Sequence, residues 1–299
     1  MGDLGAQCDQ VCRNAGIQCP YQSSTVCEGN PAEPPEMVLV APGSFTMGSP
    51  AGELGRDAND EIQHMVTVST KFGLQKTEAT QGSWSFLMGT NPSTAPACGD
   101  NCAINNVSWW DALAYANAAS MNEGLPPCYE LAGCTGSPGA GLQCTAVTVK
   151  AAGNNPLGCT GYRLPTESEW EYAYRAGTNT AFYNGGISVT DCASDPSLDR
   201  IGWYCGNSGS TLHAVAQKTA NAWGLHDMSG NVYEWCWDWY GPYPGTVTDP
   251  RGASTGTLKV LRGGSFKAKA EWSRGGFRHA SNPNVASENF GVRLARTMP

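Results

Sequence analysis

Thirteen cysteines in a chain of 299 residues are the feature that most constrains the fold. Most of them lie in stretches rich in Gly, Asn, Asp, Pro or Ser, which are too polar to build a core. Cysteines in such loops are typical of disulfide staples, which persist in an oxidising compartment. We therefore expect an exported protein with at least five disulfides, and the short turn-rich loops favour the pairs Cys98–Cys102 and Cys192–Cys205.

Zinc is the alternative use of these cysteines. Cys8 and Cys12, and likewise Cys98 and Cys102, show a C-x3-C spacing, but the sequence has only four histidines and no paired CxxC motifs, so disulfides are favoured. The first residues lack the basic and apolar regions of a signal peptide. We expect that a leader has been removed and that the protein is secreted, periplasmic or on the cell surface.

The balance of charge excludes two classes of partner. The formal net charge is −8, and no basic cluster is denser than Lys267, Lys269 and Arg274. Nucleic acids and anionic membranes bind to basic surfaces that release counterions. The chain also has no apolar run of the roughly 18 residues that a membrane helix needs. We expect no nucleic-acid partner and no membrane span.

The pattern along the chain predicts two regions. Residues 1–35 form a Cys-rich N-terminal segment with Cys8, Cys12, Cys19 and Cys27, and end in a Pro-rich spacer; residues 36–299 form the main domain. Strands are expected at 37–40, 64–70, 145–150 and 259–262, and capping-box motifs begin helices at Ser108 and at Thr166, with Gly177 as a stop. A Cys-rich insertion lies at about 124–161. With 37 glycines and 19 prolines, an irregular α+β fold is indicated.

One segment stands out as a candidate site, because the signatures of common enzymes are absent and the four histidines lie far apart in the sequence. Residues 221–240 hold six aromatic residues and three carboxylates. Asp227 and Glu234 flank the turn 229–231, whose carbonyls would join them as the hard oxygen ligands that calcium prefers. The alternative is structural: the two carboxylates cap the turn and the tryptophans fill the core.

Seven blocks of the sequence resemble, in order, those of the formylglycine-generating-enzyme family, also called the sulfatase-modifying-factor domain. They are MVLVAPGSFTMG (37–48), KTEATQ (76–81), NVSWWDA (106–112), YRLPTESEWEYA (162–173), the segment 221–239, LRGGSF (261–266) and FGVRLA (290–295). The resemblance implies this family's variant of the C-type-lectin fold, with a small twisted antiparallel sheet, two flanking helices and much irregular loop.

The resemblance also implies a metal. The family's structural calcium would be held by the side chains of Asp227 and Glu234 and by the carbonyls of Gly230 and Val232. A second family calcium would use Asn207, but the loop that follows it is too short to carry the acidic half of that site.

The sequence departs from that of the family's oxidases at the catalytic residues. The family's oxidases bind copper(I) through two cysteines after the Gly-Gly-Ser block, where soft sulfur ligands are required. Here that stretch contains no cysteine; Ser273 stands at the first position and Arg278 at the second. An iron-dependent sulfoxide synthase of the ergothioneine kind would need a His-rich helical partner domain, which is absent from this sequence. Both observations argue against an enzyme.

A binding module is therefore the favoured function, with an unknown protein or glycan as its ligand. Alternation along 266–272 predicts a strand that presents charged groups from one face. The expected recognition residues are Lys267, Lys269, Glu271, Trp272, Arg274, Arg278, His279 and Asn282. Two alternatives stay open: a variable ligand-binding protein of a diversity-generating retroelement, whose changeable residues lie in the matching stretch, and a formylglycine-generating oxidase.

Overall fold

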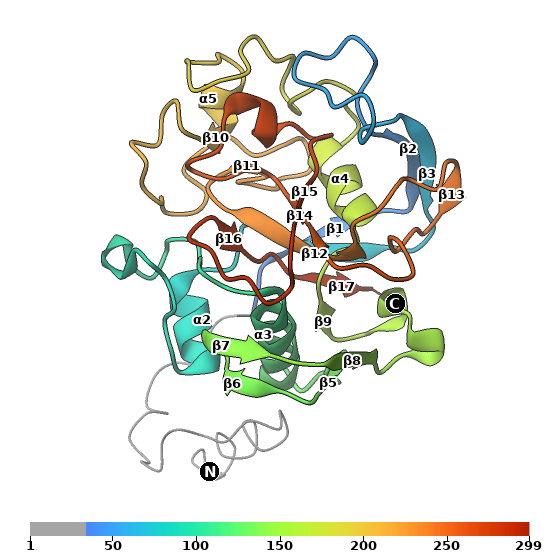
Figure 1. Ribbon diagram of the computed structural model, residues 1–299, viewed down its shortest axis with the longest axis vertical. Helices are drawn as coiled ribbons and strands as arrows, with labels where there is room; N and C mark the ends of the chain where they lie inside the picture. Colours follow the sequence, from blue (N-terminus) through green and yellow to red (C-terminus); the bar gives the residue numbers. More distant parts are fainter. Residues whose placement is uncertain (1–33, 299) are drawn as a thin grey trace.

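The computed structural model describes residues 34–298 (Figure 1). The predicted Cys-rich segment and its four cysteines, up to residue 33, lie outside the described residues. The α-helices are α2 (Gln81–Met88), α3 (Trp109–Asn122), α4 (Glu167–Arg175) and α5 (Leu198–Ile201). The strands are β1 (Met37–Val40), β2 (Gly43–Met47), β3 (His64–Val68), β4 (Phe72–Gln75), β5 (Tyr129–Ala132), β6 (Thr135–Ser137), β7 (Ala140–Gln143), β8 (Ala146–Val149), β9 (Tyr162–Arg163), β10 (Gly202–Trp203), β11 (Ser229–Gly230), β12 (Tyr233–Trp239), β13 (Val247–Thr248), β14 (Lys259–Arg262), β15 (His279–Ser281), β16 (Phe290–Gly291) and β17 (Ala295–Thr297).

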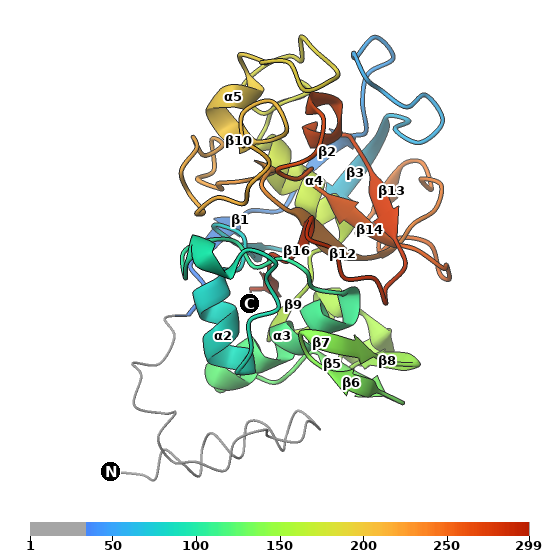
Figure 2. The ribbon, with the colours of Figure 1, turned by 60° about the vertical axis from the view of Figure 1, so that its left-hand side comes forward.

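The seven-residue strand β12 organises the interior. It lies in a four-stranded sheet of order β15-β14-β12-β16, between α4 and α3 (Figures 1 and 2). Successive side chains of a strand point to opposite faces. Trp235 of β12 and Leu261 of β14 accordingly join the hydrophobic cluster around α3, whereas Cys236 and Val260 join a second cluster that contains Trp170 of α4. The sheet is therefore covered on both faces.

The two predicted helices are confirmed, and each begins at a reciprocal capping box. The Ser108 side chain accepts from the backbone N–H of Asp111, whose carboxylate accepts from the Ser108 N–H, and Thr166 and Glu169 form the same pair at α4. Helix α4 ends one residue before the expected stop, because Ala176 already adopts a left-handed conformation. The sequence analysis did not predict α2.

A second four-stranded sheet, of order β1-β4-β17-β9, joins distant parts of the chain. Strand β17 pairs antiparallel with both β4 and β9, and β13, β3 and β2 form a smaller three-stranded sheet. Long loops connect these elements (Figure 1). The structure is thus the α+β arrangement of small sheets, few helices and much loop that the sequence predicts.

Four disulfides are formed within residues 34–298: Cys98–Cys102, Cys128–Cys159, Cys134–Cys144 and Cys192–Cys205. The two favoured pairings are confirmed. Two of the bridges fasten the insertion, which consists of the ladders β5–β8 and β6–β7 beside α3 (Figure 2). Four structural disulfides indicate an oxidising, non-cytoplasmic compartment. In this part of the chain no helix combines the length and apolarity needed to cross a membrane.

Candidate functional site

The residues predicted to bind calcium lie together around β11 and the start of β12. Asp227 and Asn231 both have positive φ, and a Cβ atom at Gly230 would collide with the carbonyl of Trp203, so this turn requires glycine. Asp227 and Glu234 are both fully buried. The local sequence therefore folds into a tight turn that places two acidic side chains in the interior.

The carboxylate of Glu234 is already occupied by other side chains. Arg293 donates from Nε to both Glu234 oxygens at 2.9 Å and from a terminal nitrogen at 2.7 Å, and Trp170 donates its indole N–H at 2.6 Å. A guanidinium at this distance neutralises the carboxylate and repels a divalent cation. Glu234 thus fits the structural alternative, an ion pair in the core, better than it fits a calcium ligand.

Asp227 and a third acid, Glu78, have different hydrogen-bond partners from those of Glu234. Asp227 Oδ2 accepts from the backbone N–H of Ala216 at 2.7 Å, but Oδ1 is buried without a hydrogen-bond partner among the described residues. Glu78, which precedes α2, accepts from Asn231 and from the N–H of Val232. Burial, followed by the charges of Asp227 and Glu234, raises the pKa of Glu78 well above its ordinary value.

The three buried acids near Arg293 differ in how well they suit a metal ion. Three buried carboxylates, Glu78, Asp227 and Glu234, face the single guanidinium of Arg293. The orphan oxygen of Asp227 suits a cation, whereas the paired Glu234 does not. Across residues 34–298, no three Asp, Glu, His or Cys side chains converge as a ready-made metal site.

Asn207, the candidate for a second ion, closes a turn. Its side-chain oxygen accepts from the Tyr204 N–H at 3.0 Å, and its amide donates to the Gly202 carbonyl at 3.0 Å and to Asp199 at 3.3 Å. Both ends of the amide are therefore engaged within the loop.

The prediction of a strand over 266–272 is wrong. The segment forms turns followed by a 3-10 helix, Ala270–Ser273. Its backbone N–H groups bond to scattered loop carbonyls, such as Asn231 for Phe266 and Asp191 for Ala270, rather than to one neighbouring strand. The alternation of burial nevertheless holds, since Phe266, Ala268 and Ala270 are buried.

Six of the predicted recognition residues are at least partly exposed: Lys267, Lys269, Glu271, Trp272, His279 and Asn282. Trp272 is 37% exposed and stacks on Phe277, and the ammonium of Lys269 lies 5.3 Å from the centre of the Trp272 ring. Lys267 forms an exposed ion pair with Glu288. We call these six residues the recognition face.

Arg274 and Arg278 do not belong to that surface, which corrects the expectation. Arg274 is 0% exposed and donates to Glu53 at 2.7 Å and to Glu61 at 2.7 and 2.8 Å. Arg278 is 6% exposed and pairs with Glu167 at 2.6 and 2.8 Å and with Asp60 at 2.7 Å. Both arginines fasten the loop that joins β2 to β3 against the segment 273–278.

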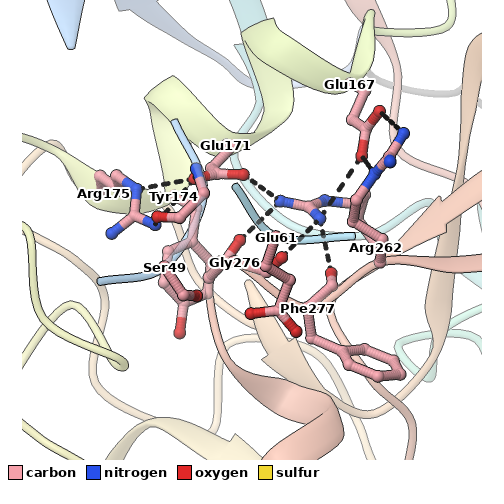
Figure 3. Close-up of polar contacts among 12 residues, drawn as sticks. Ser49, Glu61, Glu167, Glu171, Tyr174, Arg175, Arg262, Gly276 and Phe277 are labelled. Atoms are coloured by element: carbon pink, nitrogen blue, oxygen red, sulfur yellow. Dashed lines mark hydrogen bonds and ion pairs between the residues drawn. The ribbon is translucent and has the colours of Figure 1, made fainter. Parts of the chain in front are cut away.

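A third arginine, Arg262, also holds this segment (Figure 3). It pairs with Glu171 of α4 and donates to the carbonyls of residues 275, 276 and 277. Burial alone would raise the pKa of Glu167, but Arg278 and Arg262 outweigh it, and the pKa is lowered. The stretch between Ser273 and Arg278 is thus a rigid, charge-compensated platform.

No thiol lies on this platform. Ser273 is fully buried, and its hydroxyl has no partner within the described region. Cys236 is the single free cysteine of residues 34–298; it is buried in the core, and burial raises its pKa well above the ordinary value. A protonated, inaccessible thiol is neither a nucleophile nor a ligand for copper.

The small sheets, capped helices and buried arginine network define a domain of the formylglycine-generating-enzyme type. The family described as "Sulfatase-modifying factor enzyme 1-like domain" matches residues 23–298, and the chain belongs to this family.

Three relatives illustrate the similarity. The chain is 29% identical over 294 residues to the chaperone protein LppX of Paenibacillus barcinonensis, covering 92% of this chain and 94% of LppX. It is 36% identical over 149 residues to the formylglycine-generating enzyme of Thermomonospora curvata, which is 45% of this chain and 49% of that enzyme. The solved structure of Treponema denticola variable protein 1 superposes with a TM-score of 0.72 and 29% identity, covering 88% of this chain and 95% of that one.

Proposed function

We propose that this chain is an exported, non-catalytic member of its family that binds a protein or a glycan through the recognition face. The observation that carries the proposal is that residues 266–278, which follow the Gly-Gly-Ser block, contain no cysteine; by the family resemblance, Ser273 and Arg278 would stand where the oxidases have their copper-binding cysteines. Neither a buried hydroxyl nor a guanidinium paired with Glu167 binds copper(I), which prefers soft sulfur ligands.

The rigidity of the platform supports a binding role. Buried ion pairs of Arg262, Arg274 and Arg278 fix the backbone on which Lys269 and Trp272 are presented. A surface that is ordered before binding loses less conformational entropy when its ligand arrives. Trp272 combines a large apolar area with partial exposure, which is typical of residues that dominate binding energy.

Two comparisons bear on the kind of ligand. The name of LppX describes a chaperone, which favours a protein ligand for this chain. The similarity to Treponema denticola variable protein 1 supports the alternative of a variable ligand-binding protein of a diversity-generating retroelement. The exposed positions 267, 269, 271 and 272 alternate in part with buried ones, so they suit substitution without loss of the core.

Calcium stabilisation is part of the proposal and centres on the acidic side of the site. Asp227, with its orphan oxygen, would hold the ion, together with carbonyls of the turn at Gly230 and Val232. A bound ion stabilises the folded state in proportion to the logarithm of its concentration. A chelator should therefore lower the melting temperature of the wild type but not that of Asp227→Asn; an equal response of both proteins excludes the site.

The binding function is tested with a glycan array and a panel of cell-surface and envelope proteins. A ligand of the recognition face should lose about tenfold or more in affinity on Trp272→Ala, which corresponds to roughly 1.4 kcal/mol. Phe86→Ala is a matched control, because Phe86 is an aromatic residue exposed to a similar degree and lies in α2, outside the face. A ligand whose affinity is unaffected by Trp272→Ala contradicts the assignment.

The oxidase alternative has its own assay. A peptide that carries the cysteine of a sulfatase motif is incubated with the protein, copper and a reductant. We expect no aldehyde above the level of a control without protein, and aldehyde formation would restore the oxidase.

A further inference from the structure

A small pocket lies at the N-terminus of α4, next to the platform but distinct from the recognition face. It has a volume of about 110 Å³ and forms where the ends of β2, β3 and β12 meet the loop that follows β12. Its walls combine apolar and aromatic side chains with a few polar ones, including Met47, His64, Glu167, Asp238, Trp239 and Tyr243. This composition is typical of ligand pockets, in which a few polar groups orient the ligand.

The pocket has no cationic group to offer an anion. Arg278 also lines it, but its Nε and one terminal nitrogen bind Glu167, and the other terminal nitrogen binds Asp60 at 2.7 Å and the Gly241 carbonyl at 3.0 Å. The guanidinium further packs on the Tyr243 ring at 4.1 Å. These contacts use four of the five N–H groups of Arg278, and Glu167 and Asp60 balance its charge, so a phosphate, sulfate or carboxylate is disfavoured there.

One hydrogen-bonding atom in the wall is unused. His64 Nδ1 lies 3.0 Å from the carbonyl oxygen of Ile62 and must carry the hydrogen of that bond. In the neutral imidazole the other nitrogen, Nε2, is then an acceptor, and it is buried without a partner among the described residues. The ring is held in place by Tyr243, whose centroid is 4.4 Å away. A buried acceptor without a donor is costly unless a ligand or water supplies one.

Asp238 supplies the complementary donor. One of its oxygens accepts from the N–H of Glu167 at 2.9 Å. Burial and the negative charge of Glu167 raise the pKa of Asp238 to about 8, so near pH 7 this side chain carries a proton. The other charges that act on it are Glu169 of α4 and Lys259 of β14. Lys259 donates to the Trp237 carbonyl at 2.8 Å and lies among tryptophan rings.

We propose that this pocket binds an uncharged, hydroxylated group, namely one terminal sugar residue of a glycan. The side chains around His64 Nε2 must move slightly to uncover this buried atom, and a sugar hydroxyl then donates to it. Another hydroxyl accepts from the Asp238 hydroxyl, and the C–H faces of the ring lie against Trp239 and Tyr243. A volume of about 110 Å³ is small, so the pocket admits the edge of one sugar and not a chain. The inference rests on the proposed binding function and narrows its ligand class.

The test uses saturation-transfer NMR and calorimetry at pH 7, with methyl glycosides of several hexoses as probes and with butylamine and acetate as cationic and anionic controls. At least one glycoside should bind. His64→Phe keeps the ring that packs on Tyr243 but removes the acceptor, and it should weaken binding about tenfold or more. Asp238→Asn preserves a neutral donor and should change affinity less than about twofold, whereas Asp238→Ala should weaken it about tenfold.

The other outcomes overturn the inference. Binding of butylamine that is lost in Asp238→Asn would show a cation site with an ionised Asp238. Failure of all glycosides to bind would show a pocket filled by water alone. A glycoside whose affinity falls with Trp272→Ala but not with His64→Phe would place the sugar on the recognition face, so the proposed function would stand while the pocket would fail.

Discussion

The two faces of β12 are stabilised by different interactions. Toward α4, the strand presents Glu234, Cys236 and Asp238, and this side contains the arginine network. Toward α3, Trp235 and Trp237 lie in an aromatic cluster, and the neighbouring insertion is closed by disulfides. Buried apolar area contributes to the stability of the fold at each contact almost independently of the neighbouring contacts. A buried charged side chain contributes only when all of its ion-pair and hydrogen-bond partners are present. The α4 face should therefore be the more specific and the more fragile of the two.

The largest effect is expected from Glu171→Ala on the α4 face. Glu171 pairs with both Arg262 and Arg175, and all three side chains are almost fully buried. Removing the carboxylate leaves Arg175 without its ion-pair partner and Arg262 with only the longer contact to Glu167 at 3.5 Å, which costs about 3–5 kcal/mol of unfolding free energy in urea denaturation. The control is Glu288→Ala, which breaks the exposed pair with Lys267 and should cost less than about 1 kcal/mol. Equal losses in the two variants would remove the distinction between buried and surface pairs.

The next effect concerns the crosslinked side. Replacing Cys128 and Cys159 together by serine opens a bridge between residues 31 positions apart and should lower stability by about 3–4 kcal/mol. The loss should be smaller for the pair Cys98 and Cys102, which encloses a much shorter loop. Thermal unfolding of both variants without reductant measures the difference, and a reversed order would contradict the loop-entropy argument.

The dependence of stability on pH should have opposite signs on the two faces. Asp238 has a folded-state pKa of about 8 against an ordinary 3.8, so between these values the folded chain holds a proton that the unfolded chain lacks, and stability falls as pH rises. Lys259, on the aromatic face, has a pKa of about 7 against 10.5, because burial lowers it. There the unfolded chain holds the extra proton, and stability rises with pH above 7.

Urea denaturation at a series of pH values separates these two contributions. Asp238→Asn should remove a slope of at most about 1.4 kcal/mol per pH unit between pH 4 and 8. Lys259→Met should remove a slope of the opposite sign between pH 7 and 10. Unchanged slopes in both variants would show that neither group titrates differently on folding.

The smallest expected effect compares the helix caps. Ser108→Ala and Thr166→Ala each remove the acceptor of a capping box and should cost about 1 kcal/mol. The two losses should agree closely, since both caps have the same geometry. Urea denaturation measures both losses. A much larger loss for Thr166→Ala would show that α4 depends on its cap, because Glu167 and Glu171 reach their arginine partners only when the helix is correctly formed.

Local signals predicted the elements that depend on neighbouring residues. The capping boxes at Ser108 and Thr166 give the starts of α3 and α4, because a cap is complete within four residues. Helix α2 has the same reciprocal cap between Thr80 and Ser83, but serine in place of Glu or Gln hides the motif. The strand expected over 266–272 failed because a ladder needs a partner strand, which no local pattern supplies.

The candidate site was harder to predict, since its contacts join distant residues. Arg274 and Arg278 read as surface charges in the sequence, but their partners Glu61 and Glu167 lie more than 100 positions away in the chain. Glu78 lies in the block 76–81, where no neighbouring residue indicates a role for it, although it is close to Asp227 in the fold. The wall of the pocket combines six separate stretches of the chain, and the periodicity of a sequence does not indicate which distant stretches come together.

The placement of β17 determines when the protein can fold during its synthesis. This strand, at 295–297, lies between β4 and β9, so the sheet that begins at residue 37 has a gap until almost all of the described chain has left the ribosome. Domains usually fold as units, and pairing across such a separation is slow. The first sheet is consequently completed only late in synthesis, and a chain that is still incompletely folded at that stage is compatible with the export that we propose.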